Sequence, residues 1–155
     1  GSAAGTGSSV IAIRTNDDGN DCTLITGNEG NVEMGESVVT RLEGATTGFY
    51  PAYFTPVSGW LGLQIGSAYS VGRICNLTAE NDHTLTDDMI AELLALFPAS
   101  RQPNLLVMSR RSRKQLQQSR TATNATGAPA PIPEEAFGIP IIVTDGMPNT
   151  QTILA

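Results

Sequence analysis

The residues EEAFGIPIIVTDGMPNT, Glu134 to Thr150, contain the stretch that decides the fold. Its centre is the short apolar run Ile139–Val143, which follows Gly138 and precedes a group of turn residues, Asp145, Gly146 and Pro148. An apolar run of this length between turn residues is typical of a buried strand, and its isoleucine and valine content agrees. We therefore predict a buried strand near residue 140, with Thr152–Leu154 pairing beside it after a turn.

Upstream of this run, the sequence predicts a helix, a strand and a second helix. In TLTDDMIAELLALFP, Thr84–Pro98, Thr86 is placed to cap a helix whose apolar side chains form one stripe, Met89, Ile90, Leu93, Leu94 and Phe97. The run Asn104–Met108 predicts a buried strand, and Ser109 is placed to cap a helix that ends near Arg120. This second helix has one large apolar residue, Leu116, so we expect it to lie largely on a surface.

The earlier part of the chain has the composition of β-structure. Residues Val10–Arg14 predict a strand, and Glu36–Ile74 combine short alternations with many threonine, valine and aromatic residues. The polar segment Thr121–Pro133, rich in proline and glycine, predicts a loop. The sequence therefore predicts an α+β chain in three parts: a flexible start at 1–9, a β-rich segment at 10–80, and an α+β domain at 81–155.

Charge is unevenly spread along the 155 residues. Residues 1–100 hold twelve acidic and three basic residues, while residues 101–155 hold three acidic and six basic ones. A basic run lies in the second predicted helix and comprises Arg110, Arg111, Arg113, Lys114 and Arg120. It fits a solvated helix face, a subunit contact or a polyanion site. Sequence-specific nucleic-acid binding is disfavoured because no aromatic residue near the run offers a stacking platform.

Candidate catalytic and metal-binding groups are few. His83 is the only histidine; it could serve as a base for a serine or cysteine nucleophile, or lie in a solvated loop. A group of acidic residues lies among glycines and asparagines without the order of a calcium loop: Asp17, Asp18, Asp21, Glu29 and Glu33. Cys22 and Cys75 are expected to be free thiols. We expect no catalytic residue, no cofactor and no metal, and no apolar run approaches the roughly 20 residues that span a membrane.

Four motifs follow one another in a recognisable order. An aromatic β segment ends in Arg73-Ile74-Cys75-Asn76, an acid-capped helix follows, a strand leads into the basic helix, and the closing segment is Gly138–Asp145 with Asn149-Thr150. Each motif alone is compatible with generic packing. In this order they resemble the carboxy-terminal half of tailed-bacteriophage major capsid proteins with the Hong Kong 97 fold, over roughly Val10–Ala155.

The resemblance implies a fold and a role. Residues 10–80 would supply peripheral-domain strands, and residues 81–155 an axial domain with a central sheet flanked by helices. The chain would be a structural subunit of the virion, made in the cytoplasm of a bacterial host, that self-associates into capsomers and a shell and also meets a scaffold or portal protein. No membrane partner is expected. The predicted interface comprises Arg110, Arg111, Arg113, Lys114 and Arg120 with the loop prolines Pro129 and Pro131.

The same resemblance predicts a fragment. Family members are about twice this length and carry an amino-terminal arm, a long extended loop and a spine helix ahead of these motifs, and the sequence pattern indicates none of the three. Two alternatives stay open: a small hydrolase that uses His83, and another virion component such as a tail or decoration protein.

Overall fold

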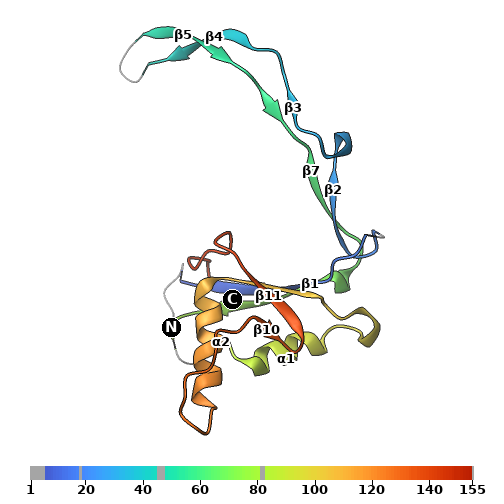
Figure 1. Cartoon of the computed structure of the whole chain (residues 1–155), viewed down its shortest axis with the longest axis vertical. Helices are drawn as coiled ribbons and strands as arrows, with labels where there is room; N and C mark the ends of the chain where they lie inside the picture. Colours follow the sequence, from blue (N-terminus) through green and yellow to red (C-terminus); the bar gives the residue numbers. More distant parts are fainter. Residues whose placement is uncertain (1–5, 18, 45–47, 81–82, 155) are drawn as a thin grey trace. The chain divides into compact units, whose positions relative to one another are not determined.

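A computed structural model of the chain describes residues 6–17, 19–44, 48–80 and 83–154. The chain forms two compact units, which Figure 1 colours along the sequence. The first, called the sheet domain, comprises Gly1–Thr23 and Ile65–Ala155. The second, called the ribbon, is Leu24–Gln64.

The sheet domain is built on a five-stranded sheet in the order β10-β11-β9-β1-β8. The central strand β1 runs antiparallel to both of its neighbours, and β11 runs parallel to β9. Helix α2 supplies the crossover that two parallel strands require. The elements of this domain are β1 (Ser8–Ile13), η2 (Ala68–Ser70), β8 (Val71–Leu77), α1 (Asp87–Ala95), η4 (Ala99–Arg101), β9 (Leu105–Met108), α2 (Arg110–Ala122), β10 (Glu135–Ala136) and β11 (Ile139–Val143).

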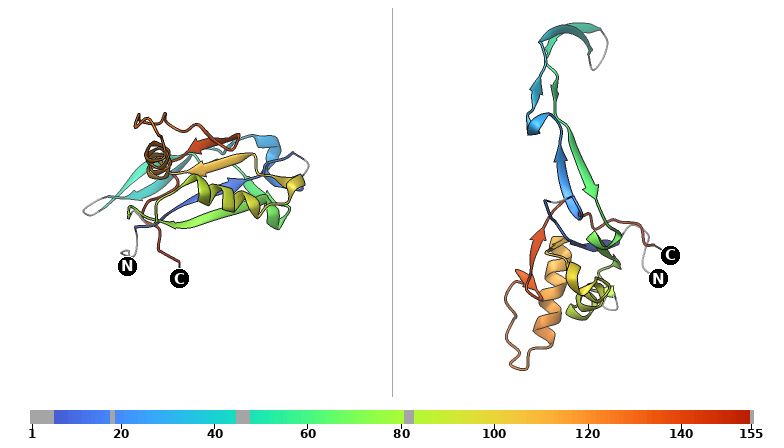
Figure 2. Two further views of the ribbon diagram at one scale, coloured as in Figure 1. Left: turned by 90° about the horizontal axis from the view of Figure 1, so that it is seen from below. Right: turned by 90° about the vertical axis from the view of Figure 1, so that its right-hand side faces the viewer.

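The hydrophobic core lies between one face of the sheet and the two helices. On that face, Val10 pairs with Met108 and Ala12 with Leu106, and all four side chains are fully buried. The helices complete the same cluster with the side chains Ile90, Leu93, Phe97 and Leu116. Figure 2 shows α1 and α2 on the same side of the sheet. The mixed α+β class predicted from the sequence is therefore confirmed.

Both helices begin where the sequence predicts. The Thr86 side chain accepts a hydrogen bond from the Met89 amide, and Asp87 and Asp88 occupy the first turn, where the helix dipole favours acids. Ser109 caps α2 in the same way by accepting from the Ser112 amide. The single large apolar side chain of α2, Leu116, is fully buried, and it fixes which face of this polar helix meets the core.

Two predictions about the last strands are wrong in part. The run Ile139–Val143 is a strand, but Ile142 is 49% exposed because the helices cover only one face of the sheet. Residues 152–154 form no strand beside it. Gln151 instead forms an antiparallel bridge with Gly7, and the Asn76 side chain exchanges two hydrogen bonds with the Leu154 backbone.

The predicted division of the chain at residue 80 is also wrong. Strands β1 and β8, both expected in the 10–80 segment, lie in the same sheet as β9 and β11. The physical reason is long-range pairing, since β1 fills the gap between β8 and β9. The expected flexible start ends in structure as well, because Ser8 and Ser9 are fully buried in β1, while its first five residues lie outside the described range.

The ribbon consists of successive two-stranded antiparallel pairs. Its strands pair as β2 with β7, β3 with β6 and β4 with β5, and none of them joins a third strand within the described residues. Glycine backbones mark the joints, where Gly27 donates to the Trp60 carbonyl and Gly35 to that of Pro56. The elements are β2 (Cys22–Thr26), η1 (Asn28–Gly30), β3 (Glu33–Met34), β4 (Val38–Glu43), β5 (Phe49–Phe54), β6 (Val57–Ser58) and β7 (Leu61–Ile65).

Candidate interaction surfaces

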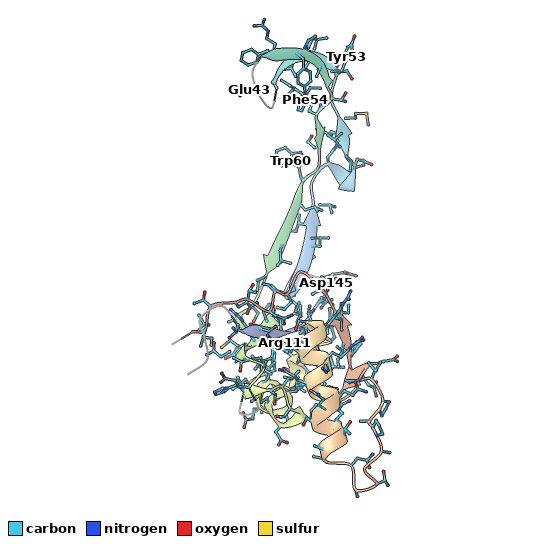
Figure 3. The ribbon with its side chains drawn as sticks, turned by 90° about the vertical axis from the view of Figure 1, so that its left-hand side faces the viewer. Glu43, Tyr53, Phe54, Trp60, Arg111 and Asp145 are labelled. Carbon is cyan, nitrogen blue, oxygen red and sulfur yellow. The ribbon has the colours of Figure 1, made fainter. Side chains whose placement is uncertain are left out.

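The ribbon carries most of the exposed apolar surface of the described residues. Fifteen of the twenty-two exposed large apolar side chains lie in it, among them Tyr53 at 84%, Leu61 at 77% and Met34 at 76% exposure. Figure 3 labels Tyr53 and Phe54 on β5 and Trp60 just before β7. An isolated two-stranded hairpin is marginal in water, and exposed apolar patches of this kind mark interaction sites. The ribbon is therefore the first candidate surface.

The two faces of the β4–β5 pair differ in charge. Cross-strand partners share a face, and Val38 faces Phe54, Thr40 faces Ala52 and Leu42 faces Tyr50. These six residues make one face without a charged group, called the uncharged face. The opposite face contains Arg41, whose guanidinium carbon lies 5.8 Å from the centre of the Phe49 ring, and Glu43. Only one face of this pair can thus be buried without covering an ion.

The structure separates the basic run into cations that have a partner within the sheet domain and cations that have none among the described residues. Arg111 and Arg120 are used inside the sheet domain, and Arg110 pairs with Asp145 at 3.1 Å, where both side chains are mostly exposed. Figure 3 labels Arg111 and Asp145. Arg113 and Lys114 make no side-chain hydrogen bond or ion pair to any described residue. These two cations are the part of the run that remains available to a partner.

Arg111 and Arg120 make hydrogen bonds that hold parts of the sheet domain together. The Nη2 group of Arg111 donates to the carbonyls of Thr6, at 2.8 Å, and Leu77, at 3.0 Å, while its buried Nε has no partner among the described residues. Burial lowers the pKa of Arg111. Arg120 grips both carboxylate oxygens of Asp87 at 2.7 and 2.8 Å, and this hydrogen bonding raises its pKa despite partial burial. Arg120 thereby ties the end of α2 to the start of α1.

The two loop prolines of the predicted interface lie at the surface. Pro129 and Pro131 are both exposed, in the segment between α2 and β10. Pro131 lines an open hollow with Ile132 and Pro140. The segment is held to α2 by two hydrogen bonds, from Gln117 to the Ala130 carbonyl and from the Ala130 amide to Thr121. The structure therefore places these prolines where a partner could reach them.

One carboxylate of the acidic group identified in the sequence is buried among hydrogen-bond donors. Asp21 is 1% exposed and accepts hydrogen bonds from Arg14 at 2.8 Å, Arg101 at 2.7 Å and Ser70 at 3.0 Å. Arg14 directly follows β1, Arg101 ends η4 and Ser70 ends η2, so one carboxylate joins three parts of the sheet domain. The described residues contain no group of histidine, cysteine, aspartate and glutamate side chains that could hold a metal ion. Asp18 of the acidic loop lies outside them.

This cluster predicts a dependence of stability on acid. Burial raises the pKa of Asp21, but hydrogen bonds from Arg14, Arg101 and Ser70 outweigh it, so that the pKa is lowered. A carboxyl whose folded pKa is below its unfolded value of about 3.9 stabilises the fold above that pH and loses its contribution as the pH falls toward the folded value. We therefore expect the temperature of the thermal unfolding midpoint to decrease as the pH is lowered below about 4.

The control for this expectation is Asp21→Asn. The variant should be less stable than the wild type at pH 7, and the difference between the two should shrink as the pH is lowered from about 5 to 2. Calorimetry across this range measures it. A difference that stays constant with pH would contradict the role assigned to the ionised carboxylate.

His83 and Cys75 lie along one cavity of about 460 Å³ with Glu92. Their side chains make no hydrogen bond to one another, and His83 is exposed. The nucleophile, base and orienting acid of a hydrolase need direct hydrogen bonds, so these three groups are neighbours without being an assembled triad.

Cys22 is buried, which raises its pKa, as does the adjacent charge of Asp21.

No protein-family model matches the sequence, and no curated protein matches it either. Among the described helices, none is long and apolar enough to cross a membrane.

Proposed function

We propose that the protein is a structural subunit of a bacteriophage capsid, a major capsid protein of the Hong Kong 97 fold that acts through contacts between copies. The observation that carries this proposal is the ribbon, a two-stranded segment with fifteen exposed large apolar side chains in a chain whose other unit has its own core. Such a surface needs cover that the described chain does not supply. A shell of repeated copies supplies it.

The ribbon also bears on the resemblance to capsid proteins. The sequence pattern indicated no long extended loop, but residues 24–64 form a two-stranded ribbon ahead of the helix–strand–helix order. A ribbon at this point of the chain supports the proposal, because the family is expected to carry an extended loop before those motifs. Contacts in which one surface of a copy meets a different surface of the next can close into rings and then a shell.

Charge supports contacts of this heterologous kind. The ribbon holds four acidic residues, Glu29, Glu33, Glu36 and Glu43, against the single cation Arg41. Helix α2 holds no acidic residue, and its Arg113 and Lys114 are unpaired within the described chain. An acidic apolar ribbon and a basic helix on different copies attract each other, which favours orientation more than affinity.

Particle mass tests the proposal. Light scattering and negative-stain electron microscopy on the purified protein should find rings of five or six copies, or closed shells. The fraction of protein in these particles should rise with protein concentration. A monomer at every concentration, in low and high salt, would contradict it. An esterase or peptidase activity that His83→Ala abolishes would favour the hydrolase instead.

The charge contact predicts a specific variant. Reversal of the two unpaired cations, Arg113→Glu with Lys114→Glu, is expected to leave the thermal midpoint within a few degrees, because surface changes usually alter stability by about 0.5 kcal/mol or less. Assembly measured by light scattering should weaken roughly tenfold. The exchange Arg113→Lys with Lys114→Arg keeps both charges and should assemble normally. Equal assembly by the reversed variant would exclude these cations from the contact.

A further inference from the structure

The free edge of the sheet at β8 borders a groove. Within the described residues β8 pairs only with β1, so its other side presents unpaired backbone groups. Two cavities, of about 460 and 240 Å³, follow this strand from Val71 to Leu77. Both are also lined by Leu93 and Leu96 from the α1 side, and Leu96 is 75% exposed. We call this hollow the β8 groove.

A hollow between an edge strand and a helix is suited to an extended chain. An added strand takes its main-chain hydrogen bonds from the edge and places alternate side chains against the helix. In the β8 groove the regular part of the edge is residues 71–74, because the pairing with β1 shifts register beyond Ile74 and Asn76 has a positive φ of 61°. The apolar helix side chains next to it can receive two or three apolar side chains.

The ribbon contains a strand that meets these requirements. Strand β4 is six residues long, about 20 Å at the usual rise, and its alternate residues Val38, Thr40 and Leu42 belong to the uncharged face. The neighbouring strand β5 is less suited, since it contains Pro51. A proline is accepted in a sheet where its missing N–H would point away from the partner strand, so the free edge of β5 lacks a donor there. Strand β4 has no proline.

We propose that β4 of a second copy of this chain adds to β8 and lays the uncharged face of its ribbon against the β8 groove. Val38, Thr40 and Leu42 of that copy then face the α1 side, and Arg41 and Glu43 stay on the opposite face, in water. Leu42 and its cross-strand partner Tyr50 then cover Leu96, and Phe54 lies one strand further from β8. This inference rests on the proposed function, because it names the surface that the ribbon contacts.

The test places one charge on each side of the contact. We expect Leu42→Glu and Leu96→Glu each to weaken self-association at least tenfold, measured by light scattering over a range of protein concentration. Both positions are exposed in the chain itself, at 43% and 75%, so the variants should fold, which circular dichroism checks. The controls are Val39→Glu, on the opposite face of β4, and Ile132→Glu, far from the groove in sequence; each should weaken association less than threefold.

A charge pair then distinguishes direct contact from an indirect effect. The double variant Leu42→Glu with Leu96→Lys should regain association to within about threefold of the wild type, since the two charges would face each other. If Leu42→Glu weakens association while Leu96→Glu leaves it unchanged, the groove is not the acceptor and only the ribbon contact survives. If neither substitution weakens it, the inference is wrong, and the ribbon contact of the proposed function is then supported only if removal of residues 28–59 abolishes assembly.

Discussion

Removal of residues 28–59, the larger part of the ribbon, is expected to leave a folded monomer. In the shortened chain, Gly27 and Trp60 are joined through an Asn-Gly turn, which fits because the Gly27 amide already donates to the Trp60 carbonyl at 3.0 Å and this dipeptide favours tight hairpins. The thermal midpoint should change by only a few degrees, since no ribbon residue belongs to the core cluster. Self-association should be lost completely.

The size of this effect follows from the area that the ribbon exposes. Burial of one large apolar side chain contributes about 1.5–3 kcal/mol, so four of them contribute roughly 6–12 kcal/mol. Association itself costs on the order of 4–15 kcal/mol in lost freedom. The apolar contribution of four side chains therefore only about balances the cost of association, so that loss of the ribbon contact leaves too little to hold two copies together.

Light scattering and a thermal melt on the same sample measure both expectations. The control is a ribbon of unchanged length in which Val38, Leu42, Tyr50 and Phe54 are all serine, which should also be monomeric and should melt like the wild type. Assembly by the shortened chain would show that the ribbon is not the contact. Loss of a cooperative melt would show that the sheet domain depends on it.

Truncation of the anchor of α2 is expected to have the largest effect on stability. Leu116 is fully buried and is the only large apolar side chain of this helix. Leu116→Ala should lower the unfolding free energy by about 2–5 kcal/mol, the range found for buried leucines. Because small domains unfold at about 5–15 kcal/mol in total, this is a large share.

Denaturation in urea measures the loss. Ile132→Ala is the control, since that side chain is 57% exposed, lies outside the β8 groove, and its removal should change the unfolding free energy by about 0.5 kcal/mol or less. Leu116→Met, which nearly conserves volume, should cost less than about 1.5 kcal/mol. Equal effects of Leu116→Ala and Ile132→Ala would mean that α2 is held by its polar contacts, such as Arg120 with Asp87.

The local elements of this fold could be read from the sequence, because short-range chemistry determines them. The caps Thr86 and Ser109 fix where α1 and α2 begin, and the turn residues around Ile139–Val143 fix the last strand. Strand partners could not be read in the same way. No periodicity indicates that β1 inserts between β8 and β9. Because of that pairing, the units are divided at the two ends of the ribbon and not at residue 80, as the sequence predicted.

For the candidate surfaces, too, the sequence did not show which residues meet across long separations in the chain. A basic run predicts a charged face, but it does not say which cations already have partners inside the domain. Arg120 pairs with Asp87, which lies 33 positions earlier, and Arg111 donates to two backbone carbonyls. The ribbon could be predicted only as a β-rich segment with short alternations, because apolar residues on both of its faces hide which face is buried and which is solvent-exposed.

The place of β1 in the sheet has a consequence for biosynthesis. Its Ser8 hydroxyl donates to Ser109, 101 positions later, so the centre of the sheet cannot close until the ribosome has passed α1 and β9. At about 5–20 residues per second, that interval is roughly 5–20 seconds. The apolar ribbon leaves the ribosome early in this interval. The nascent chain therefore exposes its most adhesive segment before it has a core, which makes it a substrate for chaperones and couples its yield to the rate of translation.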